Sequence, residues 1–308
     1  MSTESSGTGA ILAALLANVG IAVTKFIAFL VSGASSMLAE AVHSFADSGN
    51  QVLLLVGGRR SRRAATPEHP FGFGRVRYLY AFLVAIILFS VGGMFAIYEG
   101  VEKIREPHPL DSWWLAVAVL VVSILLESYS LRTALRESRP HRQNTTLLGF
   151  VRRAKAPELP VVLLEDTAAL VGLVLALGGV GLTILTGNGI WDGVGTLLIG
   201  ILLVAVAVIL GVETKSLLIG EGASPEIATS IADALAATPR VTQVIHMKTL
   251  YLGPDELMVA AKIAVPGSTT AADVADAIND AEAAIRAAVP IARVIYLEPD
   301  ILQPQATD

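Results

Sequence analysis

The sequence has no cysteine and few charged residues. Among its 308 residues, 16% are charged and 54% are hydrophobic, and the mean hydropathy is +0.65. Without cysteine the chain forms no disulfide and no thiolate metal site, so any transition-metal site must use histidine and carboxylate ligands. A soluble globular protein has roughly 25% charged residues, because its surface faces water. The composition therefore indicates a membrane protein.

Six mostly apolar stretches are long enough to cross a bilayer as helices, which takes about 20 residues. We assign them to a transmembrane domain at residues 1–220 of an α-helical polytopic membrane protein. The six predicted transmembrane helices are Thr8–Val31, Ser36–Gly57, Tyr78–Tyr98, Trp113–Leu131, Leu159–Leu185 and Val194–Val212.

The charges of the connecting loops predict an orientation. The loop after the second stretch has six arginines, and the loop after the fourth has six arginines and one lysine. The opposite side has only Lys103 and Arg105. Because basic loops stay in the cytoplasm, both termini are predicted to be cytoplasmic. Asp192, just before the sixth stretch, is interpreted as a helix-start group that the helix dipole favours.

The composition changes near residue 221, where we expect a separate cytoplasmic domain at residues 221–308. Ser224 and Pro225 are typical of a helix start, and Thr270 is expected to cap a second helix. The order αββαβ predicts a small two-layer α+β domain, ferredoxin-like in its element order. Its predicted strands are Val241–Tyr251, Glu256–Val265 and Ala292–Leu297.

Ionisable residues interrupt two of the apolar stretches. In the second, His43 and Asp47 are four residues apart and share one helical face, with Glu40 one turn earlier. The fifth contains the adjacent pair Glu165 and Asp166. An isolated charge at bilayer depth costs about 2.5–3.5 kcal/mol, so these groups should face a partner, water or an ion.

Together these side chains could form a metal site. His43, Asp47 and Asp166 would supply one imidazole and two carboxylates, and Glu165 could be a fourth ligand, a supporting group or a proton acceptor. Zn²⁺ favours four such ligands, while the oxygen-rich set also suits Mn²⁺, Fe²⁺ or Co²⁺. The alternative is structural: His43 would form an interhelical hydrogen bond, and the acids would pair with Lys25.

The motif containing His43 and Asp47 resembles one found in a known family. The run Leu38-Ala-Glu-Ala-Val-His-Ser-Phe-Ala-Asp47, the arginine-rich loop and the run His69-Pro-Phe-Gly-Phe-Gly-Arg75 together resemble the cation diffusion facilitator family. The segment Leu163–Ala169 looks like the subgroup nearest the mitochondrial or nuclear-type zinc transporters. The resemblance covers nearly the whole chain.

The resemblance implies a homodimer that exports Zn²⁺, or a similar cation such as Cd²⁺, by proton antiport. His43, Asp47 and Asp166 match three ligands of the family's transport site, but Val162 stands where many members have histidine. Glu165 is therefore the expected replacement.

Two other metal sites of the family lack most of their ligands in this sequence. His69 matches one loop ligand, but Thr66 and Phe73 replace others. In the tail His246 matches one ligand, while Ala261 and the segment Tyr296–Glu298 replace the rest. We expect no strong tail metal site.

We therefore expect a proton-coupled divalent metal transporter and not an enzyme, because the chain has no HExxH motif or nucleophile–base pair. The alternatives are a Mn, Fe or Co exporter, a metal-selective channel, or a non-transporting metal-sensing scaffold. Its expected partners are membrane lipid, protons and a second copy of the chain, with no nucleic acid. No cleavable signal is visible in Met1–Gly7, so we expect a bacterial inner (cytoplasmic) membrane.

Overall fold

The computed structural model describes residues 4–142 and 146–302. By their internal contacts these residues form two compact units. One unit contains the chain up to Arg59 and Arg77–Lys215, and the other contains Arg60–Val76 and the chain from Ser216 onward. Each unit is described by itself below.

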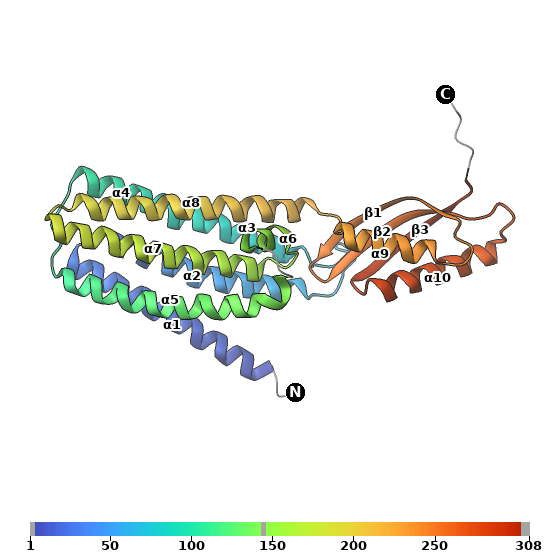
Figure 1. The fold of residues 1–308 in the computed structure, drawn as a ribbon. Coiled ribbons are helices and arrows are strands. Elements are labelled where there is room, and N and C mark those ends of the chain that lie inside the picture. The colour runs from blue at the N-terminus through green and yellow to red at the C-terminus, as the bar shows by residue number, and fades with distance from the viewer. Residues whose placement is uncertain (1–3, 143–145, 303–308) are drawn as a thin grey trace, which may run out of the picture. The chain divides into compact units, whose positions relative to one another are not determined.

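The long helices of the first unit run side by side (Figure 1). The segment after α2 forms one continuous helical run, α3, η1 and α4, in which η1 is a π-helix. The helices are α1 (Glu4–Ser32), α2 (Ser35–Ser61), α3 (Val76–Ile87), η1 (Leu88–Met94), α4 (Phe95–Arg105), α5 (Trp113–Arg142), α6 (Leu147–Arg153), α7 (Glu158–Thr186) and α8 (Ile190–Ile219).

In the described part of the chain, four helical runs are long and apolar enough to cross a membrane. These runs are Val76–Arg105, Trp113–Arg136, Glu158–Thr186 and Ile190–Ile219. Large apolar side chains such as Leu125 (67% exposed) and Leu185 (83% exposed) point outward, as expected where lipid replaces water. The predicted helical membrane domain is confirmed. The further two spans stay a prediction; they fall in α1, whose apolar part is Asn18–Ser32, and in α2, which carries the ionisable residues.

Glycines bring the run α3–η1–α4 very close to α8. A Cβ atom on Gly100 would lie 2.6 Å from the backbone nitrogen of Leu197, and one on Gly200 would lie 2.7 Å from that of Ile97. Neither position has room for a side chain, because the two backbones are in contact. Small residues that allow such an approach are typical of membrane helix pairs.

The C-terminal domain has the predicted element order α-β-β-α-β. Ser224 caps the first helix by accepting a hydrogen bond from the Ile227 amide, and Thr270 caps the second by accepting one from the Asp273 amide. Both predicted helix starts are confirmed. The elements are α9 (Pro225–Ala236), β1 (Gln243–Gly253), β2 (Glu256–Ala264), α10 (Ala271–Ala288) and β3 (Ala292–Asp300).

The three strands form one sheet in the order β1-β2-β3. The pair β1–β2 is antiparallel, and β2–β3 is parallel because α10 provides the crossover. Pairing of Ala264 with Asp300 extends β3 three residues beyond the predicted end at Leu297. Pro299 is tolerated there because β3 is an edge strand.

Helices α9 and α10 cover one face of this sheet. The core between them contains Ile231 and Leu235 of α9, Leu257 and Val259 of β2, and Ile285 of α10, all fully buried. This amphipathic arrangement follows from the apolar spacing of both helices.

The segment Arg60–Val76 belongs to the same unit as this domain. Thr66 and His69 exchange backbone hydrogen bonds at 3.0 and 3.2 Å. Gly74 lies against β1, since a Cβ atom there would be 2.5 Å from the Leu252 carbonyl oxygen. No periodic pattern in the sequence predicted this contact.

Candidate metal site

Helix α2 carries a stripe of polar side chains on one face. Glu40, His43, Asp47 and Asn50 follow one another at spacings of three or four residues. The side chains of Glu40, His43 and Asn50 are at most 1% exposed, and that of Asp47 is 20% exposed. The stripe is therefore inside the helical unit.

His43 and Asp47 lie next to each other. The Nε2 atom of His43 is 3.5 Å from Oδ2 of Asp47. Neither ring nitrogen of His43 nor Oδ1 of Asp47 has a hydrogen-bond partner among the described residues. Buried polar atoms are normally paired, so three unpaired atoms at one place suggest a bound ion or water.

Glu40 pairs with Lys25 from α1. The Lys25 Nζ atom is 2.9 Å from Oε2 of Glu40 and also donates a hydrogen bond of 2.9 Å to Ser44 Oγ. The two charged side chains are 3% and 0% exposed. Glu40 is therefore the acid that pairs with Lys25, whereas among the described contacts His43 and Asp47 form no ion pair or hydrogen bond with it.

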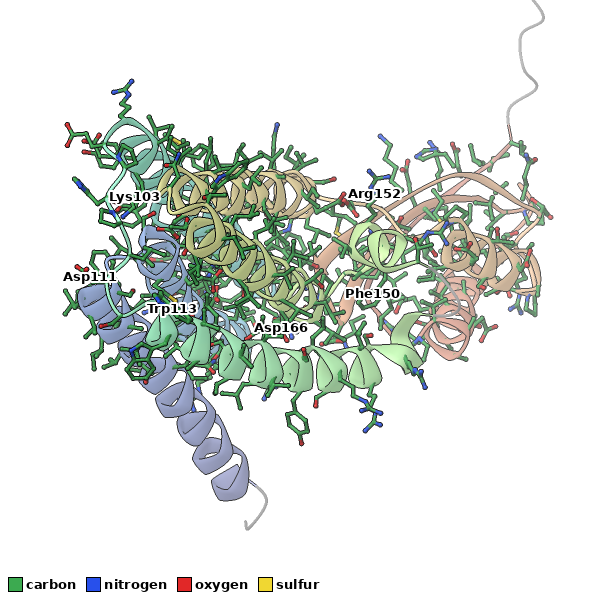
Figure 2. The ribbon with its side chains drawn as sticks, turned by 60° about the vertical axis from the view of Figure 1, so that its left-hand side comes forward. Lys103, Asp111, Trp113, Phe150, Arg152 and Asp166 are labelled. Atoms are coloured by element: carbon green, nitrogen blue, oxygen red, sulfur yellow. The ribbon has the colours of Figure 1, made fainter. Side chains whose placement is uncertain are left out.

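Glu165 and Asp166 of α7 have different partners. Glu165 is 4% exposed and accepts a hydrogen bond of 2.7 Å from Asn50 Nδ2. Asp166 accepts a hydrogen bond of 3.0 Å from Ser130 of α5, and Figure 2 shows it beside that helix. Neighbours on a helix diverge by about 100°, which explains why the two acids face different helices.

The structure brings the predicted ligands together in pairs. His43 lies next to Asp47, and Glu165 is tied through Asn50 to the same helix, α2. Within the described residues, no three His, Asp or Glu side chains are close enough to hold one ion. The assignment of His43, Asp47, Asp166 and Glu165 as ligands stays a prediction.

Two polar partners of these acids carried no strong sequence signal. Asn50 lies one turn after Asp47, so helical spacing places it on the stripe, but spacing could not show that it binds Glu165. Ser130 lies near the end of a predicted span and hydrogen-bonds Asp166 only because α5 packs against α7.

Asp192 caps the start of α2 from another helix. Its Oδ2 atom accepts hydrogen bonds from the Ser35 amide at 2.7 Å and hydroxyl at 3.0 Å, and its Oδ1 atom accepts two from Ser36. The carboxylate is 0% exposed. Asp192 does lie in the first turn of α8, as predicted, but its hydrogen bonds go to the unpaired N–H groups of α2.

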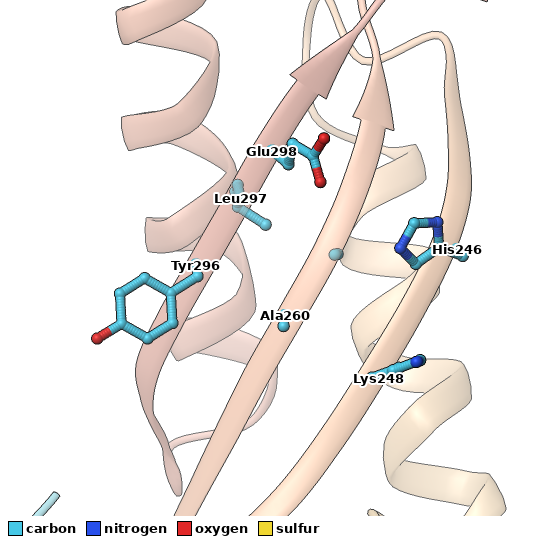
Figure 3. Close-up of a pocket in the computed structure, with 7 residues that line it drawn as sticks. His246, Lys248, Ala260, Tyr296, Leu297 and Glu298 are labelled. Carbon is cyan, nitrogen blue, oxygen red and sulfur yellow. The ribbon is translucent and has the colours of Figure 1, made fainter.

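The C-terminal domain has a separate surface pocket of about 250 Å³. His246 and Glu298 line it from the two edge strands, with Ala260 of β2 between them (Figure 3). Lys262 forms ion pairs with Asp300 at 2.8 Å and with Glu298 at 3.1 Å, and both raise the pKa of Lys262. The hydrogen bond from Lys262 in turn lowers the pKa of Asp300. A lysine next to the acid opposes cation binding in this pocket.

Two protein families match the chain. The family described as the cation efflux transmembrane domain matches residues 11–219. The family described as the cation efflux protein, cytoplasmic domain, matches residues 223–300. Together they cover both units of the structure.

Several characterised proteins are similar in sequence. The mouse (Mus musculus) protein named proton-coupled zinc antiporter SLC30A9, mitochondrial, is 33% identical over 79% of this chain and 43% of its own length. Metal tolerance protein C4 of Arabidopsis thaliana is 30% identical over 82% of this chain and 56% of its own. Magnetosome protein MamM of Paramagnetospirillum magneticum is 23% identical over 78% and 72%. The chain thus spans about half the length of the first two relatives.

Proposed function

Because the chain belongs to the cation diffusion facilitator family, we propose that it carries a divalent metal cation, Zn²⁺ in the first instance, across a membrane in exchange for protons. The similarity to mouse SLC30A9 supports zinc as the substrate, since that protein is named a mitochondrial proton-coupled zinc antiporter.

The observation that carries this proposal is the pair His43 and Asp47. A neutral imidazole and a carboxylate with their lone pairs unused suit a cation, and they lie inside an apolar helical unit. Asp166 and Glu165 would complete the ligand set from α7. Each now accepts a single hydrogen bond, from Ser130 or Asn50, which a rotation of the side chain could exchange for a metal bond.

The same groups can couple metal to protons. Metal binding requires a neutral histidine and ionised carboxylates, so a metal that enters the site expels protons from it. A protein that opens the site alternately to each side would release metal on one side and take up protons there. The polar stripe of α2 and the pair on α7 would form this shared site.

We further propose that α1, α2, the run α3–η1–α4, α5, α7 and α8 are the six membrane spans, with both termini in the cytoplasm. The arginines of the two cytoplasmic loops support this orientation. The match to the cytoplasmic-domain family supports a homodimer. We place the protein in a bacterial inner membrane, while one relative is named as mitochondrial.

Zinc flux into proteoliposomes that contain the purified full-length chain tests the transport function. A zinc-sensitive dye and a pH-sensitive dye are trapped together, and an imposed pH gradient should drive zinc against its concentration gradient. Competition by Mn²⁺, Fe²⁺, Co²⁺ and Cd²⁺ then ranks the substrates. His43→Ala and Asp47→Ala should reduce flux to the level of empty liposomes while the dimer stays intact.

Matched controls are available at exposed positions. His108 and Asp111 lie in a loop and are exposed, so His108→Ala and Asp111→Ala should transport like the wild type. Normal zinc flux in Asp47→Ala would contradict the site assignment. Zinc flux that never responds to a pH gradient would contradict antiport and favour a channel.

A further inference from the structure

Lys25 places a fixed positive charge next to the proposed transport site. Its Nζ atom is 2.9 Å from both Oε2 of Glu40 and Oγ of Ser44, the residue that follows His43. The Lys25 side chain is 3% exposed, so little water lies between its charge and the stripe that carries His43 and Asp47. A charge in this position influences any cation bound by those two residues.

The pair of Lys25 and Glu40 is poorly explained as a purely structural contact. Glu40 keeps its Oε1 atom without a hydrogen-bond partner among the described residues, although the side chain is 0% exposed. Gly172 of α7 makes room for that oxygen, since a Cβ atom there would lie 2.8 Å from it. A buried ion pair with an unpaired oxygen is often no more stable than an apolar pair of the same size.

We propose that Lys25 sets the cation affinity of the transport site, because its charge offsets the carboxylate of Glu40 and limits how tightly the site holds a divalent cation. This inference rests on the proposed transport function. With Lys25 present, one of the buried carboxylates is neutralised before any metal arrives. The metal then binds less tightly, and it can leave on the far side of the membrane.

The direction of the change in zinc affinity can be predicted for substitutions of Lys25 and of Glu40. Removing the positive charge leaves Glu40 as an additional negative charge near the metal, so Lys25→Met should bind zinc about tenfold more tightly or better. Removing the negative charge leaves Lys25 uncompensated, so Glu40→Gln should bind zinc about tenfold more weakly or worse. Removing both charges together should restore the wild-type affinity.

The test is a double-mutant cycle on the full-length chain. Equilibrium zinc binding is measured at pH 7.5 by competition with a fluorescent chelator for the wild type, Lys25→Met, Glu40→Gln and the double variant. Lys25→Arg, which keeps the charge, is the matched control and should bind like the wild type. In proteoliposomes Lys25→Met should lower both the KM for zinc and the maximal rate, because release becomes slower.

The possible outcomes separate the two proposals. Zinc affinities that shift in opposite directions in the two single variants and return to the wild-type value in the double variant support the role of Lys25. Equally weakened zinc binding in both single variants, with intact dimers, would overturn it, because either substitution would break a structural contact and so have the same effect. If Lys25→Met does not fold, identical affinities of Glu40→Gln and the double variant would overturn it. A wild-type chain that neither binds nor transports zinc would instead refute the proposed function.

Discussion

Substitution of Asp192 should destabilise the start of α2. The carboxylate accepts four hydrogen bonds there, two from the backbone N–H groups of Ser35 and Ser36 and two from their hydroxyls. A helix start has no intrahelical acceptor for its first N–H groups, so a buried helix end depends on such a partner. Asp192→Ala removes all four contacts at once.

The loss in the free energy of unfolding depends on which of the four donors can find another acceptor. Both hydroxyls can rotate, and that of Ser35 already lies 3.0 Å from the Thr196 hydroxyl. The two backbone N–H groups cannot rotate, and each buried donor without an acceptor costs about 1–3 kcal/mol. We therefore expect Asp192→Ala to lower the free energy of unfolding by about 2–6 kcal/mol. Asp192→Asn keeps one acceptor oxygen, so it should cost about half as much.

The assay is denaturant unfolding of the full-length chain in detergent, followed by its helical circular dichroism. Asp111→Asn is the control, because this residue is also an aspartate near the start of an apolar helix, but it lies in the preceding loop and its side chain is exposed. The control should stay within about 0.5 kcal/mol of the wild type. Equal free energies of unfolding for Asp192→Ala and Asp111→Asn would refute the capping role of Asp192.

Three other predictions concern packing, capping and pH. Gly100→Ala should lower the free energy of unfolding of the helical unit by about 1–3 kcal/mol, because its methyl group would lie 2.6 Å from the Leu197 nitrogen. Gly181→Ala is the control: a methyl group there meets no atom within 4 Å, so the free energy of unfolding should stay the same or rise. Ser224→Ala and Thr270→Ala should each cost about 1 kcal/mol and speed hydrogen exchange in the first turns of α9 and α10, while Ser230→Ala inside α9 should not. The pKa of Asp273 lies below its usual value, first because of the hydrogen bond from Thr270 and then because of Arg240. The ionised Asp273 carboxylate therefore stabilises the folded state above the usual aspartate pKa, and this stabilisation is lost as the pH falls. An NMR titration that gives Asp273 an ordinary pKa would contradict this prediction.

The sequence was sufficient for the features that depend on local patterns. Apolar stretches of about 20 residues predict membrane helices because a bilayer requires that length and composition. The caps at Ser224 and Thr270 were predictable because a side-chain hydroxyl one turn before a free N–H group satisfies it within the same segment. The shared face of His43 and Asp47 follows in the same way from the helical repeat.

The tertiary structure decided every contact between residues far apart in the chain. Helical spacing places Glu40 and Asp47 on one side of α2, but only the packing of α1 shows that Glu40 is the acid with which Lys25 pairs. The partners of Glu165 and Asp166 depend likewise on how α7 packs against α2 and α5. Asp192 shows the limit most clearly: its place in the first turn of α8 could be predicted from local signals, whereas its hydrogen bonds to α2 join residues more than 150 positions apart, which only folding brings together.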